Sequence, residues 1–183
     1  MTCYGGKELA ASFRTVRANT IQIAEEIPEA KYDFRAAADC RSIGRTLAHI
    51  AVASGIQMHM HSNKIDDLKN VNFPELVQKL AAEEAKPRTK TAIIALLEAE
   101  GERFASFLEG LADSFLAERV IMPPGARPAS KSRFEMLLSP KEHEMHHRGQ
   151  LMMMERMLGL VPHLTRQFQA RMAQAQQARQ AQQ

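Results

Sequence analysis

The sequence has no tryptophan, only two tyrosines and only two cysteines. A surface that stacks nucleic-acid bases needs aromatic side chains among clustered Lys and Arg, so this composition argues against nucleic-acid binding. Cys3 and Cys40 do not form the close pairs of zinc or redox motifs, and we expect reduced thiols. No apolar run approaches the roughly 18 residues of a membrane span, and residues 1–10 lack the apolar segment of a signal peptide. We therefore expect a cytoplasmic protein without membrane contact.

Acidic residues are absent after Glu155, where four arginines follow. Because the whole chain has a net charge of +3, residues 1–155 carry −1 and do not supply a basic surface. With 183 residues and 45% hydrophobic content, one domain over residues 1–164 is the simplest organisation. Residues 165–183, rich in Gln, Ala and Arg, are predicted to form a solvated tail that is partly helical and frayed at its end.

Apolar residues recur at helical spacing along most of the chain, whereas the alternation typical of strands is almost absent. Long helices are predicted at residues 7–26, 43–61, 90–118 and from 140 onward, with a short one at 73–85. Residues 122–128, rich in proline and glycine, are predicted to be a loop. This pattern predicts an all-α protein built as a four-helix bundle with one extra short helix.

A helix-start signal precedes the densest histidine cluster of the chain. Ser139 can act as the N-cap, Pro140 suits the first helical position, and Glu142 can complete a capping box. The sequence therefore predicts that a helix begins here and carries residues 143–147, which hold three of the seven histidines.

His143 and His147 are four residues apart, on one largely apolar face of that predicted helix, so both should point into the core. Their rings would lie roughly 6 Å apart, and both nitrogens can bind one metal ion at about 2.0–2.1 Å. The alternative is a pair of ordinary core histidines, but each would then need a buried hydrogen-bond partner, so we favour a metal site. His146 lies about 60° from this face. His146 and Gln150 are candidates to support the ligands from beside the site.

His49 lies within the predicted helix 43–61, in a stretch that is apolar or small on all sides. Burial of an imidazole without a partner is costly, so His49 is the natural third ligand. Taken alone, a core histidine bonded to a carbonyl would be the simpler interpretation. His59 and His61 lie toward the polar end of the helix, where we expect them to be solvated or to line an entrance.

Two segments together resemble the DinB/YfiT-like superfamily: Ser-Ile-Gly-Arg-Thr-Leu-Ala-His at residues 42–49, and His-Glu-Met-His-His-Arg-Gly-Gln-Leu at residues 143–151. The resemblance covers about residues 9–166. It implies an up-down-down-up four-helix bundle, frequent dimerisation, and a divalent-metal site with His49, His143 and His147 as ligands. Related families include thiol-dependent transferases and isomerases.

Residues 143–147 also match the HExxH pattern of zinc peptidases, in which Glu144 would be the general base. A third ligand is hard to find, because Gln150 stands where the extended motif requires glycine and Glu155 is the only later acid. We therefore strongly favour a metal site in the core of the bundle over a peptidase active site. The predicted role of Glu144 is a surface ion pair with Arg148.

Three neutral imidazoles leave coordination positions open on a divalent metal, for which zinc or nickel is expected. Such an ion can activate water for hydrolysis or a low-molecular-weight thiol for transfer. The sequence thus predicts a metal-dependent hydrolase or S-transferase that acts on a small molecule or thiol, as a homodimer, with no catalytic residue identified. The alternative is a non-catalytic bundle with a structural or sensory metal. A cavity leading from solvent to the site would favour catalysis, and a closed shell would favour structure.

Overall fold

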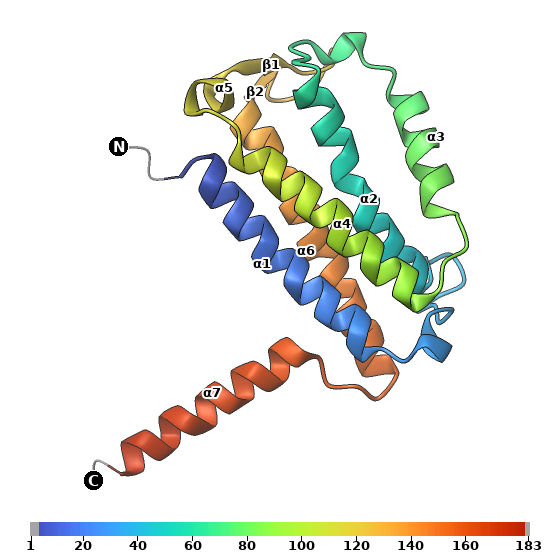
Figure 1. Ribbon diagram of the computed structural model, residues 1–183, viewed down its shortest axis with the longest axis vertical. Coiled ribbons are helices and arrows are strands. Elements are labelled where there is room, and N and C mark those ends of the chain that lie inside the picture. The colour runs from blue at the N-terminus through green and yellow to red at the C-terminus, as the bar shows by residue number, and fades with distance from the viewer. Residues whose placement is uncertain (1–3, 182–183) are drawn as a thin grey trace.

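The computed structural model describes residues 4–181, which form a helical bundle with one projecting helix (Figure 1). Four long helices make up the bundle: α1 (Gly6–Glu26), α2 (Ile43–Ser62), α4 (Lys90–Glu109) and α6 (Arg133–Met157). Helices α1 and α6 run in one direction and α2 and α4 in the other, which confirms the up-down-down-up order (Figure 1). Helices α1 and α2 each pack against both α4 and α6, so the first two helices lie across the bundle from each other.

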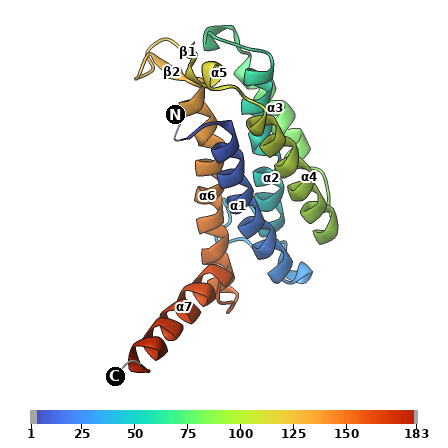
Figure 2. The ribbon, with the colours of Figure 1, turned by 60° about the vertical axis from the view of Figure 1, so that its left-hand side comes forward.

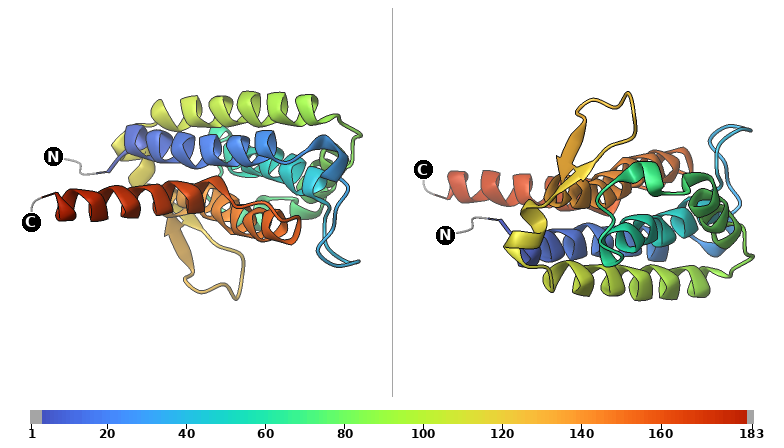
Figure 3. Two further views of the ribbon diagram at one scale, coloured as in Figure 1. Left: turned by 90° about the horizontal axis from the view of Figure 1, so that it is seen from below. Right: turned by 90° about the horizontal axis from the view of Figure 1, so that it is seen from above.

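The shorter elements lie at the ends and on the outside of the bundle. They are η1 (Glu29–Lys31), η2 (Leu68–Asn70), α3 (Phe73–Glu84), α5 (Asp113–Ala117), β1 (Arg119–Ile121) and β2 (Ser130–Ser132). Helix α3 packs against the outside of α2, while α5 and the antiparallel β1–β2 hairpin lie at one end (Figures 1 and 2). Helix α7 (His163–Gln180) projects from the other end, as seen in Figures 2 and 3.

The core fills the space between the four long helices, as their apolar periodicity requires. Near one end, Phe13 of α1 and Phe104 of α4 meet edge to face, with ring centroids 5.0 Å apart. A second cluster, around Leu47, Leu97 and Leu151, joins α2, α4 and α6 toward the other end. These two clusters hold α2 and α6 in the fixed relation on which any site between them depends.

Helix α6 begins at Arg133 and not at Pro140, so the predicted start at Ser139 is wrong. Ser132 caps the helix, and Glu135 completes the capping box by accepting a hydrogen bond from the Ser132 backbone N–H at 2.6 Å. This earlier box satisfies the helix start. Pro140 then lies inside the helix, where it is buried against the bundle.

The predicted helix 90–118 is also divided, because α4 ends at Glu109 and α5 is a separate turn of helix. The two strands flank the predicted loop 122–128 and are three residues each, too short to show alternation in the sequence. Within residues 4–181, no helix combines the length and apolar character of a membrane span.

Helix α7 gives the predicted tail a regular conformation, although only His163, at its first position, is buried. The division between residues 1–164 and 165–183 stays a prediction. Cys3 lies outside the described residues, and Cys40 is a half-buried free thiol.

Candidate metal centre

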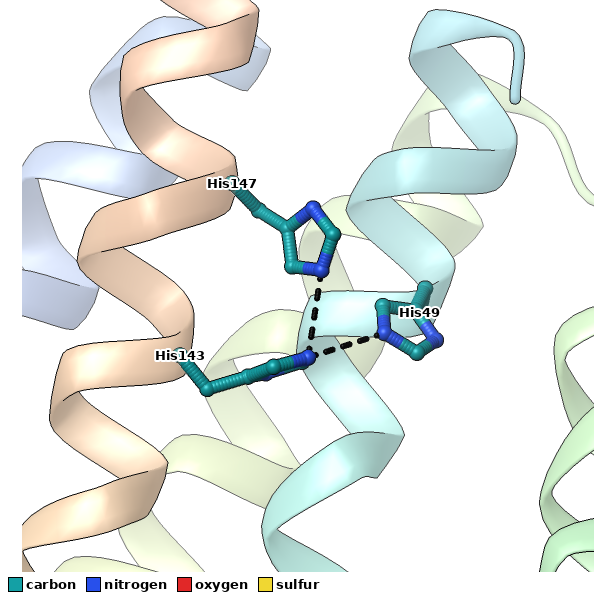
Figure 4. Close-up of side chains that lie close together, drawn as sticks. All are labelled: His49, His143 and His147. Atoms are coloured by element: carbon teal, nitrogen blue, oxygen red, sulfur yellow. Dashed lines mark hydrogen bonds between the residues drawn. The ribbon is translucent and has the colours of Figure 1, made fainter. Parts of the chain in front are cut away.

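Helices α2 and α6 bring His49, His143 and His147 together in the interior of the bundle (Figure 4). The Nε2 atom of His143 lies 3.1 Å from Nε2 of His49 and 3.1 Å from Nε2 of His147. Metal–nitrogen bonds of about 2.0–2.1 Å in a tetrahedral arrangement place two nitrogens roughly 3.3 Å apart. The two 3.1 Å spacings are close to this value, and all three nitrogens lie within 4.8 Å of one another, as a single first-row metal ion requires.

Two of these rings are held in the tautomer that a metal requires. The Nδ1–H of His49 donates to Oε2 of Glu84 at 3.0 Å, and the Nδ1–H of His147 donates to Oε1 of Gln150 at 2.7 Å. Because the proton is on Nδ1, each Nε2 presents its lone pair toward the common point. Lone pairs that converge in this way repel one another unless a cation or a proton lies between them, so the donor set fits a divalent metal.

The protein environment keeps the three imidazoles neutral, which ligation requires. Burial is the main cause of the lowered pKa of His49, His143 and His147, and that of His143 falls to about 4. The neighbouring imidazoles and the positive charge of Arg41 lower the pKa of His143 further. At neutral pH the site therefore offers three uncharged nitrogen donors.

Glu84 is the residue of the site that sequence reasoning missed. It is the only buried residue of α3, and its carboxylate accepts hydrogen bonds from Nε of Arg41 at 2.8 Å and Nε of Arg45 at 2.7 Å, besides the one from His49. The carboxylate thus orients the His49 ring. Carboxylates that accept a hydrogen bond from a zinc-bound histidine commonly have this role. No sequence signal distinguishes Glu84 from the acid beside it, because the contact depends on how α3 packs against α2.

The two predicted supporting residues lie beside the histidines. Gln150 contacts His147 directly, while its Nε2 donates to Nε2 of His146 at 3.2 Å. His146 is exposed and reaches the site only through this amide and through a ring contact with His147. Both residues are therefore near the candidate centre, with Gln150 in the closer position.

Two neighbouring cavities reach the histidines, and both are lined by Arg41 and by Ala81 and Glu84 of α3. The larger, of about 680 Å³, is lined by His147, Gln150, Glu84 and three arginines. The smaller, of about 340 Å³, is lined by His49, His143, Glu84 and apolar residues of α2 and α3. The site is therefore accessible from solvent, unlike a closed structural metal site.

Glu144 does not form the predicted surface pair with Arg148. Glu144 is 1% exposed, and its carboxylate accepts hydrogen bonds of 3.0–3.1 Å from Nε and Nη2 of Arg17 in the core. The reason is geometric: Glu144 follows His143 by about 100° around α6, which turns it toward α1. Held in this pair, Glu144 is unsuitable as the general base of an HExxH peptidase.

His61 is also placed differently from the prediction. It is 1% exposed, and its Nδ1 accepts a hydrogen bond at 3.2 Å from Nη1 of Arg133, the first residue of α6. Burial, with the nearby Arg133 charge, lowers the pKa of His61 to about 4. His59 is exposed, as expected. Neither residue reaches the candidate centre.

The bundle topology and the inward-facing histidines together define a class of helical proteins with a three-histidine site. The model of the DinB family matches residues 2–180, and the chain belongs to this family. No curated protein matches the chain by sequence.

Three solved structures show the same fold. A DinB-like protein from Bacillus subtilis has 19% identity and a TM-score of 0.61 over 83% of this chain and 92% of its own. YfiT from Bacillus subtilis, described as a probable metal-dependent hydrolase with an unusual four-helix bundle topology, has 15% identity and a TM-score of 0.65 over 87% and 91%. A mycothiol-dependent maleylpyruvate isomerase has 15% identity and a TM-score of 0.61 over 82% of this chain but 63% of its own. At these identities the likeness establishes the fold alone.

Proposed function

We propose that the protein is a metal-dependent enzyme in which His49, His143 and His147 hold a divalent ion, zinc or nickel. The observation that carries this proposal is the convergence of three Nε2 atoms at a point reached by solvent-accessible cavities. A divalent ion bound by three neutral imidazoles supplies Lewis acidity, which can activate water or a small thiol. The reaction class is therefore hydrolysis or S-transfer on a small molecule.

The chain's own residues have separate roles in this proposal. Glu84 and Gln150 orient the rings of His49 and His147. The larger cavity receives the substrate beside His147, and the smaller one, on the His143 side, offers apolar surface from Ala53, Ile56 and Leu80. The neighbour described as a probable metal-dependent hydrolase supports activation of water, and the one described as a mycothiol-dependent isomerase supports a small thiol at the site.

A structural or sensory metal is the second candidate. It would be favoured by a fourth protein ligand, and the described residues offer only three His, Cys, Asp or Glu side chains in this cluster. Accessible cavities beside the three histidines favour catalysis instead.

The test begins with the metal content of the purified protein, measured by elemental analysis. We expect about one ion per chain in the wild type and a large loss in His49→Ala, His143→Ala and His147→Ala. His59→Ala, on the same helix as His49 but exposed, is the matched control and should retain the metal. The loaded protein is then screened against esters, and against thiols paired with electrophiles. Metal content unchanged in all three ligand variants would refute the site.

We also propose that the protein is a homodimer. Large apolar side chains of α6 and α7 are exposed to solvent: Met145, Met153 and Met157 on α6, and Phe168 and Met172 on α7, the last two 63% and 56% exposed. A second copy that packs against these helices would remove this apolar surface from water. Sedimentation analysis should show a dimer for the wild type and a shift toward monomer for Phe168→Glu/Met172→Glu. A monomeric wild type would refute this part.

A further inference from the structure

We propose that the substrate is a small organic anion, and that Arg41 and Arg45 bind its carboxylate or equivalent oxyanion in the cavity beside His147. The proposal rests on the metal-dependent function above and narrows its substrate class.

The two arginines are arranged so that their outer ends are available. Each uses its Nε–H to donate to the same oxygen of Glu84, at 2.8 Å for Arg41 and 2.7 Å for Arg45. Their side chains are 43% and 47% exposed, and both line the larger cavity. Among the hydrogen bonds of the described residues, none uses a terminal Nη atom of either arginine. Glu84 thus fixes two guanidinium groups while leaving their Nη–H groups unused, which suits an oxyanion.

The charge balance of the cavity favours the same ligand. Arg35 is a third guanidinium in the lining, opposed by Asp39 and by Glu84, whose carboxylate already has three hydrogen-bond partners. A divalent cation at the histidines would add two further positive charges. A cavity with this excess of positive charge attracts anions and raises their local concentration.

Arg41 connects the arginine pair to the histidine cluster. It lines both cavities, and its Nε–H donates to the same Glu84 carboxylate that accepts the hydrogen bond from His49. An anion held by Arg41 therefore lies within electrostatic reach of the centre. Met153, Met154 and Ala81 supply apolar surface in the larger cavity. The preferred ligand thus combines an anionic group with an apolar part.

Phenylacetate and phenylacetamide form a suitable pair of probes, because they have nearly the same shape and differ in charge. Binding is measured by calorimetry on zinc-loaded and metal-free protein, since a carboxylate can also bind zinc directly. We expect phenylacetate to bind at least tenfold more tightly than phenylacetamide to the loaded protein, and to keep part of this preference without metal.

Arg41→Gln and Arg45→Gln should each weaken phenylacetate binding about tenfold and leave phenylacetamide unaffected. Each single variant leaves Glu84 one arginine partner, and zinc content shows whether the histidine site is intact. Arg171→Gln removes one positive charge from the exposed part of α7 and is the matched control, with no expected effect. Arg41→Lys should restore part of the affinity, because it keeps the charge but loses the planar fork.

The proposal is overturned if the two probes bind alike, if neither binds, or if the arginine variants bind phenylacetate as the wild type does. Failure of the wild type to take up zinc would instead refute the proposed function. In that case anion binding by the metal-free protein still tests the role of the arginines.

Discussion

Arg17 and Glu144 form a buried ion pair between α1 and α6, with Nη2 of the arginine 3.0 Å from Oε2 of the glutamate. The same guanidinium donates to the carbonyl oxygens of Leu97 at 2.7 Å and Ile50 at 3.2 Å. One arginine of α1 thus contacts the other three helices of the bundle. Because Glu144 follows His143 in the chain, the pair also fixes the rotation of α6 that turns His143 toward α2.

Removal of Glu144 should therefore reduce stability. Glu144→Ala leaves the Arg17 charge buried without its partner, and breaking such pairs typically costs about 3–5 kcal/mol. The free energy of unfolding is measured by urea titration, with Glu142→Ala, on the exposed side of α6, as the control. Arg17→Met/Glu144→Leu should recover most of the loss. An unchanged free energy of unfolding in Glu144→Ala would contradict the structural role.

Glu84→Gln should weaken metal binding while the fold is retained. The amide cannot match the carboxylate as an acceptor for the His49 Nδ1–H, and loss of such partners typically lowers metal affinity 10–100-fold. Zinc affinity is measured by competition with a chelator. Glu83→Gln is the matched control, since Glu83 pairs with Lys86 and Arg88 away from the histidines. Equal zinc affinities in the two variants would show that Glu84 does not orient His49.

Gly101→Ala should destabilise the bundle. A Cβ at this position would lie 2.8 Å from Cγ of Arg17, whose guanidinium is held by the buried hydrogen bonds described above and cannot easily move. Overpacking of this kind costs about 1–3 kcal/mol. Gly149→Ala meets no atom within 4 Å and should instead stabilise α6 by roughly 0.5–1 kcal/mol. Thermal unfolding of both variants gives the comparison. A Gly101→Ala variant more stable than the wild type would show that the Arg17 side chain can move to make room for the methyl group.

Glu155 should make stability depend on pH. Its side chain is fully buried with both carboxylate oxygens unpaired, and burial, with the nearby Glu26 charge, raises its pKa from 4.5 to about 7. Between these two values the folded protein keeps a proton that the unfolded chain has lost. The free energy of unfolding therefore falls as pH rises through this range and levels off above it.

Glu155→Gln removes this contribution, because the amide does not ionise. We expect the variant to match the wild type near pH 4.5 and to be about 2–3 kcal/mol more stable at pH 8. The free energy of unfolding of both proteins is measured by urea titration across this pH range. The difference between the two isolates the contribution of Glu155 from that of the other titrating residues. A difference that does not change with pH would contradict the raised pKa.

Much of the fold is readable from local sequence patterns. The apolar spacing in α1 and α6 depends only on the period of a helix, and it places the core-facing side of each one correctly. The same period puts His143 and His147 on one face of α6, since residues four apart are neighbours on any helix. The start of α6 is ambiguous in the sequence, because Ser132 and Ser139 both begin capping-box patterns and only Ser132 caps the helix.

The sequence by itself determined the class of fold and the burial of the candidate ligands His49, His143 and His147, because helical periodicity and the cost of burying an imidazole are local properties of the chain. Only the tertiary structure decided that these rings converge, that Glu84 supports His49, that Glu144 pairs with Arg17, and that three arginines line the cavity beside His147. These contacts join residues on different helices. Their geometry depends on how the helices rotate and pack, which no single segment encodes.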